Sequence, residues 1–344
     1  MKRNGKILAL LLVTFLMITT LAGCSKAAPT SATTPTAGAK HVLKLSNVFT
    51  AEQPLNITLK EVADNIKKRT NGSIEIQIYP NGEIPNSQDG VEQVVRGADL
   101  ILVDSPSNMG SWVPDYDAFL GPMLYTSQEE YSKMCKTDLA KSINKMAEAK
   151  GIKVLSLDYT FGFRSLGGQT AINTPADLKG KKWRVPKSQL WIDTLTAMGS
   201  NPVPTAWSEV FSGMQSGVFD GFETSVSDMY DNKLQEVVKN VSLTRHFLGT
   251  TGVMLSTKVW GTLSPEEQKI MEEEFLAGAI KNNERMVVVE ADARKGMEAA
   301  GVKFNEVDVE AFRKATAVVF TKNDKFTPGI YDKINAELKT IRGK

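Results

Sequence analysis

The sequence has few cysteines and histidines and lacks the short motifs that mark many enzymes. Only 2 cysteines and 2 histidines occur in 344 residues. His41 and His246 have no cysteine, glutamate or second histidine at the spacing of a metal site, so we expect neither metal nor cofactor. The chain has no Gly-x-Ser-x-Gly elbow, P-loop or Gly-x-Gly-x-x-Gly turn. Their absence argues against serine hydrolases and nucleotide-dependent enzymes.

The chain also has no excess of charge of either sign. Its formal net charge is +2, and Lys2, Arg3 and Lys6 belong to an N-terminal segment that we expect to be removed. Without them, 38 of the 41 basic residues remain against 39 acidic ones. Such a balanced surface offers no basic field to nucleic acid or anionic lipid, so no nucleic-acid partner is expected.

The N-terminus reads as a targeting segment. Three basic residues precede an apolar run over residues 7–18, which is too short to span a membrane comfortably. The run leads to Leu21-Ala22-Gly23-Cys24, which resembles the lipobox of bacterial lipoproteins. We therefore predict a lipoprotein signal peptide over residues 1–23, lipidation (palmitate) at Cys24, and an extracytoplasmic protein anchored to the cell membrane or to the periplasmic side of a membrane.

Residues 24–40 are rich in Ala, Thr, Ser and Pro, which predicts a flexible tether. With Cys24 assigned to lipid, Cys135 stands alone and an internal disulfide is excluded. No catalytic partner lies near Cys135 in the sequence, so we interpret it as a small, half-buried apolar residue.

Past the tether, short apolar strands alternate with amphipathic helices, which predicts an α/β fold. About 300 residues favour two lobes, the first layer ending near Asp158. Strands are predicted over 43–48, 74–78, 100–103, 152–157, 182–185, 218–222, 241–247, 252–256 and 302–304. Helices are predicted over 55–66, 91–95, 127–149, 189–198, 208–217, 309–321 and 327–341, with a long helix from the Ser264-Pro265-Glu266-Glu267 start to about residue 299.

Two arginines stand beside apolar residues at strand ends. Arg184 follows Lys181 and Lys182, as a residue of a solvated face would. Strand alternation, however, turns Trp183 away and leaves Arg184 facing a cleft or solvent. A guanidinium can clamp a carboxylate through two parallel hydrogen bonds, so both Arg184 and Arg164 are candidate anion-binding residues.

Six further short motifs lie around these arginines, over some sixty residues. They are Asp177-Leu178-Lys179-Gly180, Trp183-Arg184-Val185-Pro186, Pro202-Val203-Pro204, Ser208-Glu209-Val210-Phe211, Gln215-Ser216-Gly217 and Asp220-Gly221-Phe222-Glu223. Together they resemble TRAP transporter solute-binding proteins, the DctP-like family, over essentially the whole chain after the tether. The resemblance implies a protein that captures a small organic acid and delivers it to the small and large TRAP membrane subunits, not an enzyme.

The resemblance also implies a fold: two α/β lobes of the type II periplasmic-binding-protein kind, with mixed sheets flanked by helices and a long helix spanning both lobes. We expect lobe 1 to comprise residues 41–160 plus 250–288, and lobe 2 residues 161–249 plus 289–344. The same fold would also serve as the ligand-binding module of a membrane sensor or an ATP-driven importer, an alternative the residues leave open.

By the same resemblance, Arg184 is the principal clamp on the ligand carboxylate and Arg164, twenty positions upstream, its assistant. Thr224 stands where family members often carry an asparagine that donates to the same carboxylate. Trp207 either lies against the ligand or packs under the helix that follows it. Glu223 supports the arginines. Asp220 and Glu223 could also be a catalytic carboxylate pair with Glu209 as a third acid, but no histidine supports that interpretation.

On the opposite lobe, Asn47 and Asp104 follow strands and should face the cleft, although both residue types are also ordinary turn formers. The sequence does not specify which acid is bound.

Overall fold

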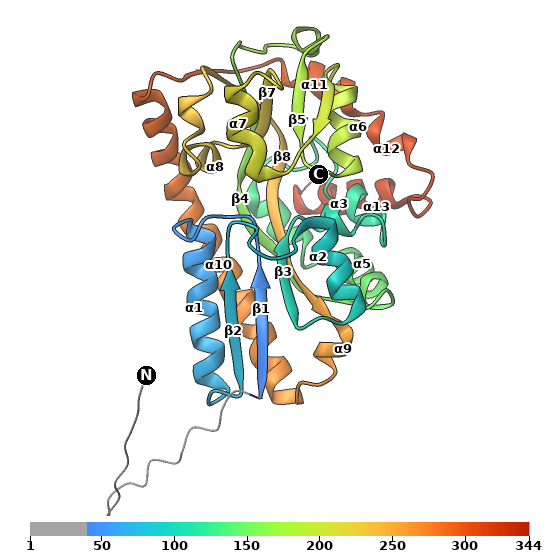
Figure 1. Ribbon diagram of the computed structural model, residues 1–344. Helices are drawn as coiled ribbons and strands as arrows, with labels where there is room; N and C mark the ends of the chain where they lie inside the picture. The colour runs from blue at the N-terminus through green and yellow to red at the C-terminus, as the bar shows by residue number, and fades with distance from the viewer. Residues whose placement is uncertain (1–39, 344) are drawn as a thin grey trace, which may run out of the picture. The chain divides into compact units, whose positions relative to one another are not determined.

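A computed structural model describes residues 40–343 of the protein. The predicted signal peptide, Cys24 and nearly all of the tether lie outside these residues. One mixed sheet of nine strands runs in the order β2-β1-β3-β8-β4-β7-β5-β6, and β9 pairs with β8 (Figure 1). The strands are β1 (His41–Ser46), β2 (Ile74–Tyr79), β3 (Leu100–Asp104), β4 (Ile152–Gly168), β5 (Lys182–Val185), β6 (Asn201–Pro204), β7 (Gly221–Ser225), β8 (Asn240–Ser256) and β9 (Lys303–Asn305).

Helices cover both faces of this sheet. They are α1 (Pro54–Arg69), α2 (Ser87–Arg96), α3 (Asp115–Phe119), α4 (Gln128–Met134), α5 (Asp138–Glu148), α6 (Gln189–Ala197), α7 (Val210–Gln215), α8 (Val226–Asp231), α9 (Thr257–Trp260), α10 (Pro265–Ala299), α11 (Val309–Thr316), α12 (Val319–Lys322) and α13 (Ile330–Ile341). Short 3-10 turns are η1 (Pro106–Met109), η2 (Pro175–Leu178), η3 (Trp207–Glu209) and η4 (Leu234–Glu236).

The two longest strands connect the halves of the sheet. β4 and β8 each have 17 residues and pair antiparallel, with β1–β3 on one side of the pair and β5–β7 on the other. The prediction of separate strands over 241–247 and 252–256 is therefore wrong. Gly249 looks like a turn residue in the sequence, but a Cβ there would come within 2.6 Å of the Phe161 ring on β4. Its glycine permits the close approach of two continuous strands.

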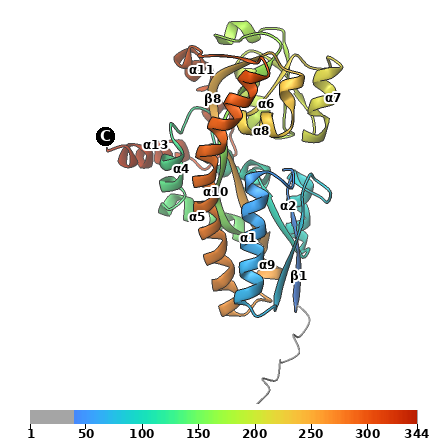
Figure 2. The same cartoon turned by 90° about the vertical axis from the view of Figure 1, so that its left-hand side faces the viewer.

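Helix α10 runs along both halves of the sheet, as predicted. Its start is a capping box, in which Ser264 accepts from the Glu267 amide and the Glu267 carboxylate accepts from the Ser264 amide. We call the part of the sheet with β1–β3 the first half and the part with β5–β7 the second half. The helix contacts α1 beside the first half and α8 beside the second (Figure 2). A single rigid element therefore links the two groups of strands.

Burial along β3 shows why a continuous apolar strand forms here. Leu100 and Leu102 enter the apolar core under α2 to α5, while Ile101 and Val103 enter the core under α1 and α10. A third core lies under α7 and α8 around Phe222. The residues of this strand, which pairs parallel with β1 and antiparallel with β8, are thus buried on both faces of the sheet, as expected where helices cover both sides.

Two other expectations change or stay open. The predicted helix over 127–149 is two helices, because Thr137 accepts from the Ala140 amide and begins α5 as a separate element. The predicted lobe boundaries remain a prediction, since contacts group the described residues in one compact unit. Across residues 40–343, no helix has both the length and the apolar character that membrane crossing requires.

Candidate functional site

The two predicted arginines lie on strands that flank β7. Arg164 on β4 pairs with Ser225 of β7, and Arg184 on β5 pairs with Phe222. Alternation along β5 sends Trp183 and Val185 into the core and turns Arg184 to the opposite side. Both guanidinium groups line the same cavity, although each arginine side chain is almost fully buried.

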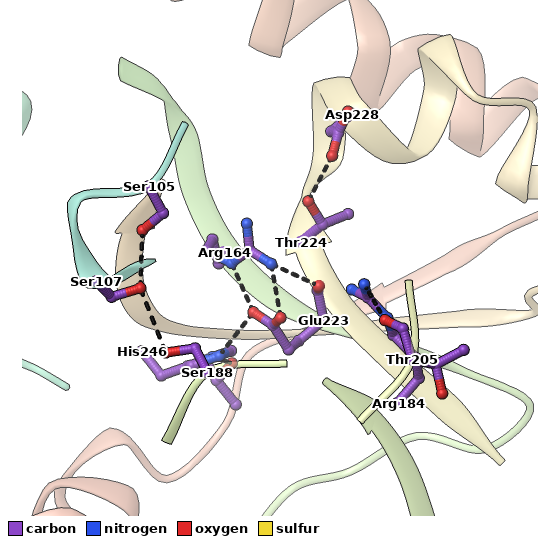
Figure 3. Close-up of polar contacts among 11 residues, drawn as sticks. Ser105, Ser107, Arg164, Arg184, Ser188, Thr205, Glu223, Thr224, Asp228 and His246 are labelled. Atoms are coloured by element: carbon purple, nitrogen blue, oxygen red, sulfur yellow. Dashed lines mark hydrogen bonds and ion pairs between the residues drawn. The ribbon is translucent and has the colours of Figure 1, made fainter. Parts of the chain in front are cut away.

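Arg164 is held by Glu223 of β7 (Figure 3). Its Nε and Nη2 each donate to a carboxylate oxygen of Glu223 at 2.6 Å, and Nη2 also donates to the Glu223 carbonyl at 3.0 Å. Burial would raise the pKa of Glu223, but the charge and hydrogen bonds of Arg164 outweigh it and lower the pKa to about 2. The pair is therefore ionised, and it fixes the plane of the Arg164 guanidinium.

His246 lies behind this pair. Its Nε2 is 3.4 Å from Glu223 Oε2, and its Nδ1 is 2.8 Å from Thr244 Oγ1. Burial lowers the pKa of His246, although Glu223 opposes that shift. The imidazole therefore belongs to the support of Glu223 and stands one layer away from the cavity.

Arg184 is held differently. Its Nε and Nη2 both donate to the Thr205 carbonyl, at 2.9 and 2.6 Å, and its guanidinium lies 5.4 Å from the centre of the Trp207 ring. Among residues 40–343, no carboxylate forms an ion pair with it. Burial is the main cause that lowers the pKa of Arg184 to about 10. At neutral pH the cavity wall thus carries a buried cation that makes no ion pair with a carboxylate of residues 40–343, and an anion in the cavity would stabilise it.

The cavity has a volume of about 340 Å3. Its lining combines cations, carboxylates, hydroxyl groups and aromatic rings from both halves of the sheet. The lining residues are Val48, Phe49, Asn86, Ser87, Gln88, Asp89, Asp104, Ser105, Ser107, Asn108, Phe161, Arg164, Arg184, Pro186, Lys187, Trp191, Thr205, Ala206, Trp207, Thr224, Asp228, Thr250 and Thr251.

Five of the seven predicted ligand-contacting residues lie on this wall: Arg184, Arg164, Trp207, Thr224 and Asp104. The other two lie behind it. Glu223 is fully buried against Arg164. Asn47 is fully buried and makes a local network, donating to Asn56 Oδ1 at 2.7 Å and accepting from the Phe49 amide at 3.0 Å. Asn47 therefore shapes the loop after β1 instead of lining the cavity.

Asp228 is a cavity residue that sequence reasoning missed. Its carboxylate accepts from Thr224 Oγ1 at 2.7 Å, from Asn232 Nδ2 at 3.1 Å and from Gln53 Nε2 at 2.9 Å. Burial raises the pKa of Asp228 despite these donors. A signal was present, because Ser225 followed by Asp228 three positions later marks a helix start directly after the β7 strand.

Contacts between the two halves bridge the cavity. Gln53, directly before α1, donates to the Asp228 carboxylate of α8 at 2.9 Å. Ser188 Oγ lies 3.4 Å from Ser107 Oγ (Figure 3). The Phe49 and Phe161 rings meet edge to face with centres 5.3 Å apart. These contacts between the halves describe a closed cleft. Asp104 makes no such bridge, because it accepts from the Ser87 and Ser105 amides of its own half, at 2.9 and 2.7 Å.

A cleft between two halves of a shared sheet, lined by a buried arginine that makes no ion pair within residues 40–343, suits a binding protein for small anions. The chain belongs to the DctP family, the bacterial extracellular solute-binding proteins of family 7, whose pattern matches residues 45–325. The predicted family and its function in TRAP-type uptake of small organic acids are thereby confirmed, and the family is one of transport proteins.

Three relatives show the range of the family. A TRAP periplasmic solute-binding protein from Fusobacterium nucleatum, with bound sn-glycerol-3-phosphate, is 45% identical, has a TM-score of 0.86, and the match covers 88% of this chain and 98% of that one. One from Desulfovibrio salexigens, in complex with diglycerolphosphate, gives the same four values. The C4-dicarboxylate-binding periplasmic protein DctP of Rhodobacter capsulatus is 26% identical over 78% of this chain and 81% of its own length.

Proposed function

We propose that this protein binds a small hydroxylated acid in the closed cleft, with the acid group at Arg184 and the hydroxyl groups at the carboxylates of the wall, and that it is held at the membrane through Cys24. The observation that carries the proposal is the Arg184 guanidinium, which is buried and has no carboxylate partner among the described residues. Arg164 lines the same cavity but is already neutralised by Glu223.

The acid we favour is a phosphate ester of a small polyol. A phosphate monoester carries a charge of about −1.5 to −2 at pH 7 and offers three strong acceptor oxygens. Arg184 and Lys187 at the cavity rim are two cations that make no ion pair among the described residues, which matches that charge better than a single carboxylate would. The 45% identical relative with bound sn-glycerol-3-phosphate supports this choice, and the one in complex with diglycerolphosphate supports a phosphate ester more generally.

The hydroxylated part of the ligand has partners of its own. Asp228 and Asp104 line the cavity, and a carboxylate accepts hydrogen bonds from hydroxyl groups. Phe49, Phe161 and Trp191 supply apolar surface against which a carbon chain can lie. This combination of carboxylates and aromatic rings suits a polyol better than a purely apolar acid.

A carboxylate is the second candidate acid. The dicarboxylate-binding relative favours it, as does the ability of a guanidinium to bind a carboxylate through two parallel hydrogen bonds. The pH dependence of binding separates the two candidates. A phosphate monoester takes up a proton near pH 6, so its affinity should fall between pH 7 and 5, whereas a carboxylate stays ionised down to about pH 4.

The test is a thermal-shift series followed by calorimetry, with sn-glycerol 3-phosphate compared with glycerate as its carboxylate counterpart. A ligand at a hundredfold excess over its Kd stabilises the folded state by about 2.7 kcal/mol, so a true ligand raises Tm clearly. We expect the phosphate to raise Tm and glycerate to have little effect. A shift with glycerate, or with C4-dicarboxylates, and none with the phosphate would assign the site to carboxylates.

A ligand can shift the protein from an open to a closed form if it binds the closed form more tightly. The Gln53–Asp228 and Ser107–Ser188 contacts join the halves only when the cleft is closed, so a ligand that binds both halves stabilises the closed form. The closed form would then be delivered to the small and large TRAP membrane subunits.

Labelling with a palmitate analogue in cells tests the proposed lipid anchor at Cys24, with Cys24→Ser as the control. We expect label on the wild-type protein and none on C24S.

A further inference from the structure

A second hollow lies on the far side of Trp207. It has a volume of about 260 Å3 and shares four of its lining residues, Val48, Asn86, Ala206 and Trp207, with the cavity described above. The shared residues come from both halves of the sheet, so this second chamber belongs to the same cleft. The indole of Trp207 forms part of the wall between the two spaces.

Trp207 is held from both sides. On the cavity side its ring lies under the Arg184 guanidinium, 5.4 Å from ring centre to Cζ. In the second chamber its Nε1 donates to Asn232 Oδ1 at 3.3 Å, and Asn232 Nδ2 in turn donates to the Asp228 carbonyl at 2.9 Å and carboxylate at 3.1 Å. The partition is thus tied to two residues of the acid-binding cavity, Arg184 and Asp228.

The two spaces differ in chemistry. The first is lined by arginines, a lysine and carboxylates, whereas no charged side chain from residues 40–343 lines the second. Its polar lining consists of amides and a hydroxyl from Asn81, Asn86, Asn232 and Ser208, set against an apolar floor that includes Val210 and Leu234. Uncharged donors and acceptors beside carbon surface match a chain of CH–OH groups. A charged group would lose its hydration there without gaining an ionic partner.

We propose that the chamber beyond Trp207 is a second subsite, which takes the uncharged, hydroxyl-bearing end of a ligand whose acid group is bound at Arg184. The subsite rests on the proposed function, because it assumes an acid at Arg184. It predicts that one cleft serves ligands of two lengths: a three-carbon acid occupies the first space alone, and a longer polyol acid passes Trp207 and occupies both. Trp207 is then the residue that determines which lengths are accepted.

The experiment fills the chamber without touching the acid site. Ser208 is exposed, lines only the second chamber and has no hydrogen bond from its side chain among the described contacts, so Ser208→Phe adds bulk there. Ser212 is also exposed, on the neighbouring helix α7, and lines neither space, so Ser212→Phe controls for added bulk, although it also removes a 3.2 Å bond from Ser212 Oγ to the Glu209 carbonyl. Calorimetry with the full mature chain compares a short ligand, sn-glycerol 3-phosphate, with a long one, glycerophosphoglycerol.

We expect S208F to weaken binding of the long ligand by about tenfold or more, which is the loss of roughly 1.4 kcal/mol of contact, while the short ligand keeps its affinity within about twofold. S212F should bind both as the wild type does. Equal weakening of both ligands by S208F, or no effect on either, would overturn the subsite. So would a change confined to the association rate of both ligands in stopped-flow tryptophan fluorescence, because the chamber would then be an entry path.

The second-subsite proposal can be tested independently of the phosphate assignment. If neither phosphate binds the wild-type protein, the phosphate assignment fails and the pair becomes glycerate and gluconate, a short and a long carboxylate. Selective loss of gluconate binding in S208F would still support the chamber as a polyol subsite. Equal affinities of S208F and the wild type for gluconate would overturn it.

Discussion

Replacing Glu223 by glutamine should destabilise the fold strongly and in a pH-dependent way. Glu223 is fully buried and makes two hydrogen bonds of 2.6 Å to Arg164. The substitution leaves the Arg164 cation buried beside a neutral amide. Breaking a buried ion pair by removing one partner typically costs about 3 to 5 kcal/mol.

The pKa of Glu223 gives an independent estimate of how much the ionised pair stabilises the fold, and the two values are similar. This pKa falls from an ordinary 4.5 to about 2 in the folded protein. A depression of that size corresponds to roughly 3 kcal/mol of stabilisation by the ionised form. Because the folded pKa is the lower one, this stabilisation is fully present above pH 4.5 and is lost as the pH falls from 4.5 toward 2.

The assay is urea unfolding of wild type and E223Q at pH 7, 5, 4 and 3.5, with Glu306→Gln as control. Glu306 also binds an arginine through two bonds, to Arg245 at 2.8 and 3.0 Å, but both side chains are exposed. The control should therefore lose no more than about 1 kcal/mol. The reasoning would be refuted if E223Q were as stable as the wild type at pH 7. It would also be refuted if the difference in unfolding free energy between wild type and E223Q stayed constant down to pH 3.5.

Three further outcomes follow from particular contacts. Gln53→Ala removes the bond to Asp228 across the cleft and should weaken ligand binding by about tenfold in calorimetry, since bonds to charged groups contribute about 1.5 to 3 kcal/mol; unchanged affinity would contradict the role of this contact in closure. Gly249→Ala places a Cβ 2.6 Å from Phe161 and should lower stability in urea by about 1 to 3 kcal/mol, whereas a neutral effect would show that β4 and β8 can separate there. Ser264→Ala removes the N-cap of α10 and should lower the free energy of unfolding, measured thermally, by about 1 kcal/mol. Ser264→Asp should keep most of the wild-type stability, and an equal loss of stability in both variants would count against capping.

Much of the site could be predicted because it lies on regular strands. Alternation around Trp183 and Val185 was enough to turn Arg184 away from the core, and the spacing of the motifs identified the family. Arg164 and Thr224 also line the cavity, since β4 and β7 pair in a register that brings them near each other. Periodicity within a strand thus predicts which side a residue faces, whereas the pairing of β4 and β5 with β7 is known only from the structure.

The rest depended on contacts between distant segments. Gln53 and Asp228 are 175 positions apart, and no local pattern links them. Asn47 follows a strand, as a cleft residue would, yet Asn56 and the Phe49 amide hold it inside its own loop. The continuity of β8 through Gly249 was hidden for the same reason, because a glycine that admits a neighbouring strand and a glycine that makes a turn look alike in sequence.

The most direct measurement of the central claim is calorimetric titration of Arg184→Ala and Arg184→Lys with the acid that the wild type binds. Two of the five N–H groups of Arg184 serve the Thr205 carbonyl, which leaves the others for a ligand. Losing two charge-assisted bonds costs about 3 to 6 kcal/mol, so R184A should bind at least a hundredfold more weakly, and R184K should also bind weakly because an ammonium cannot form the fork. Removing a buried cation that makes no ion pair among residues 40–343 should leave the Tm of the ligand-free protein unchanged or raised. Wild-type affinity in R184A would contradict the account.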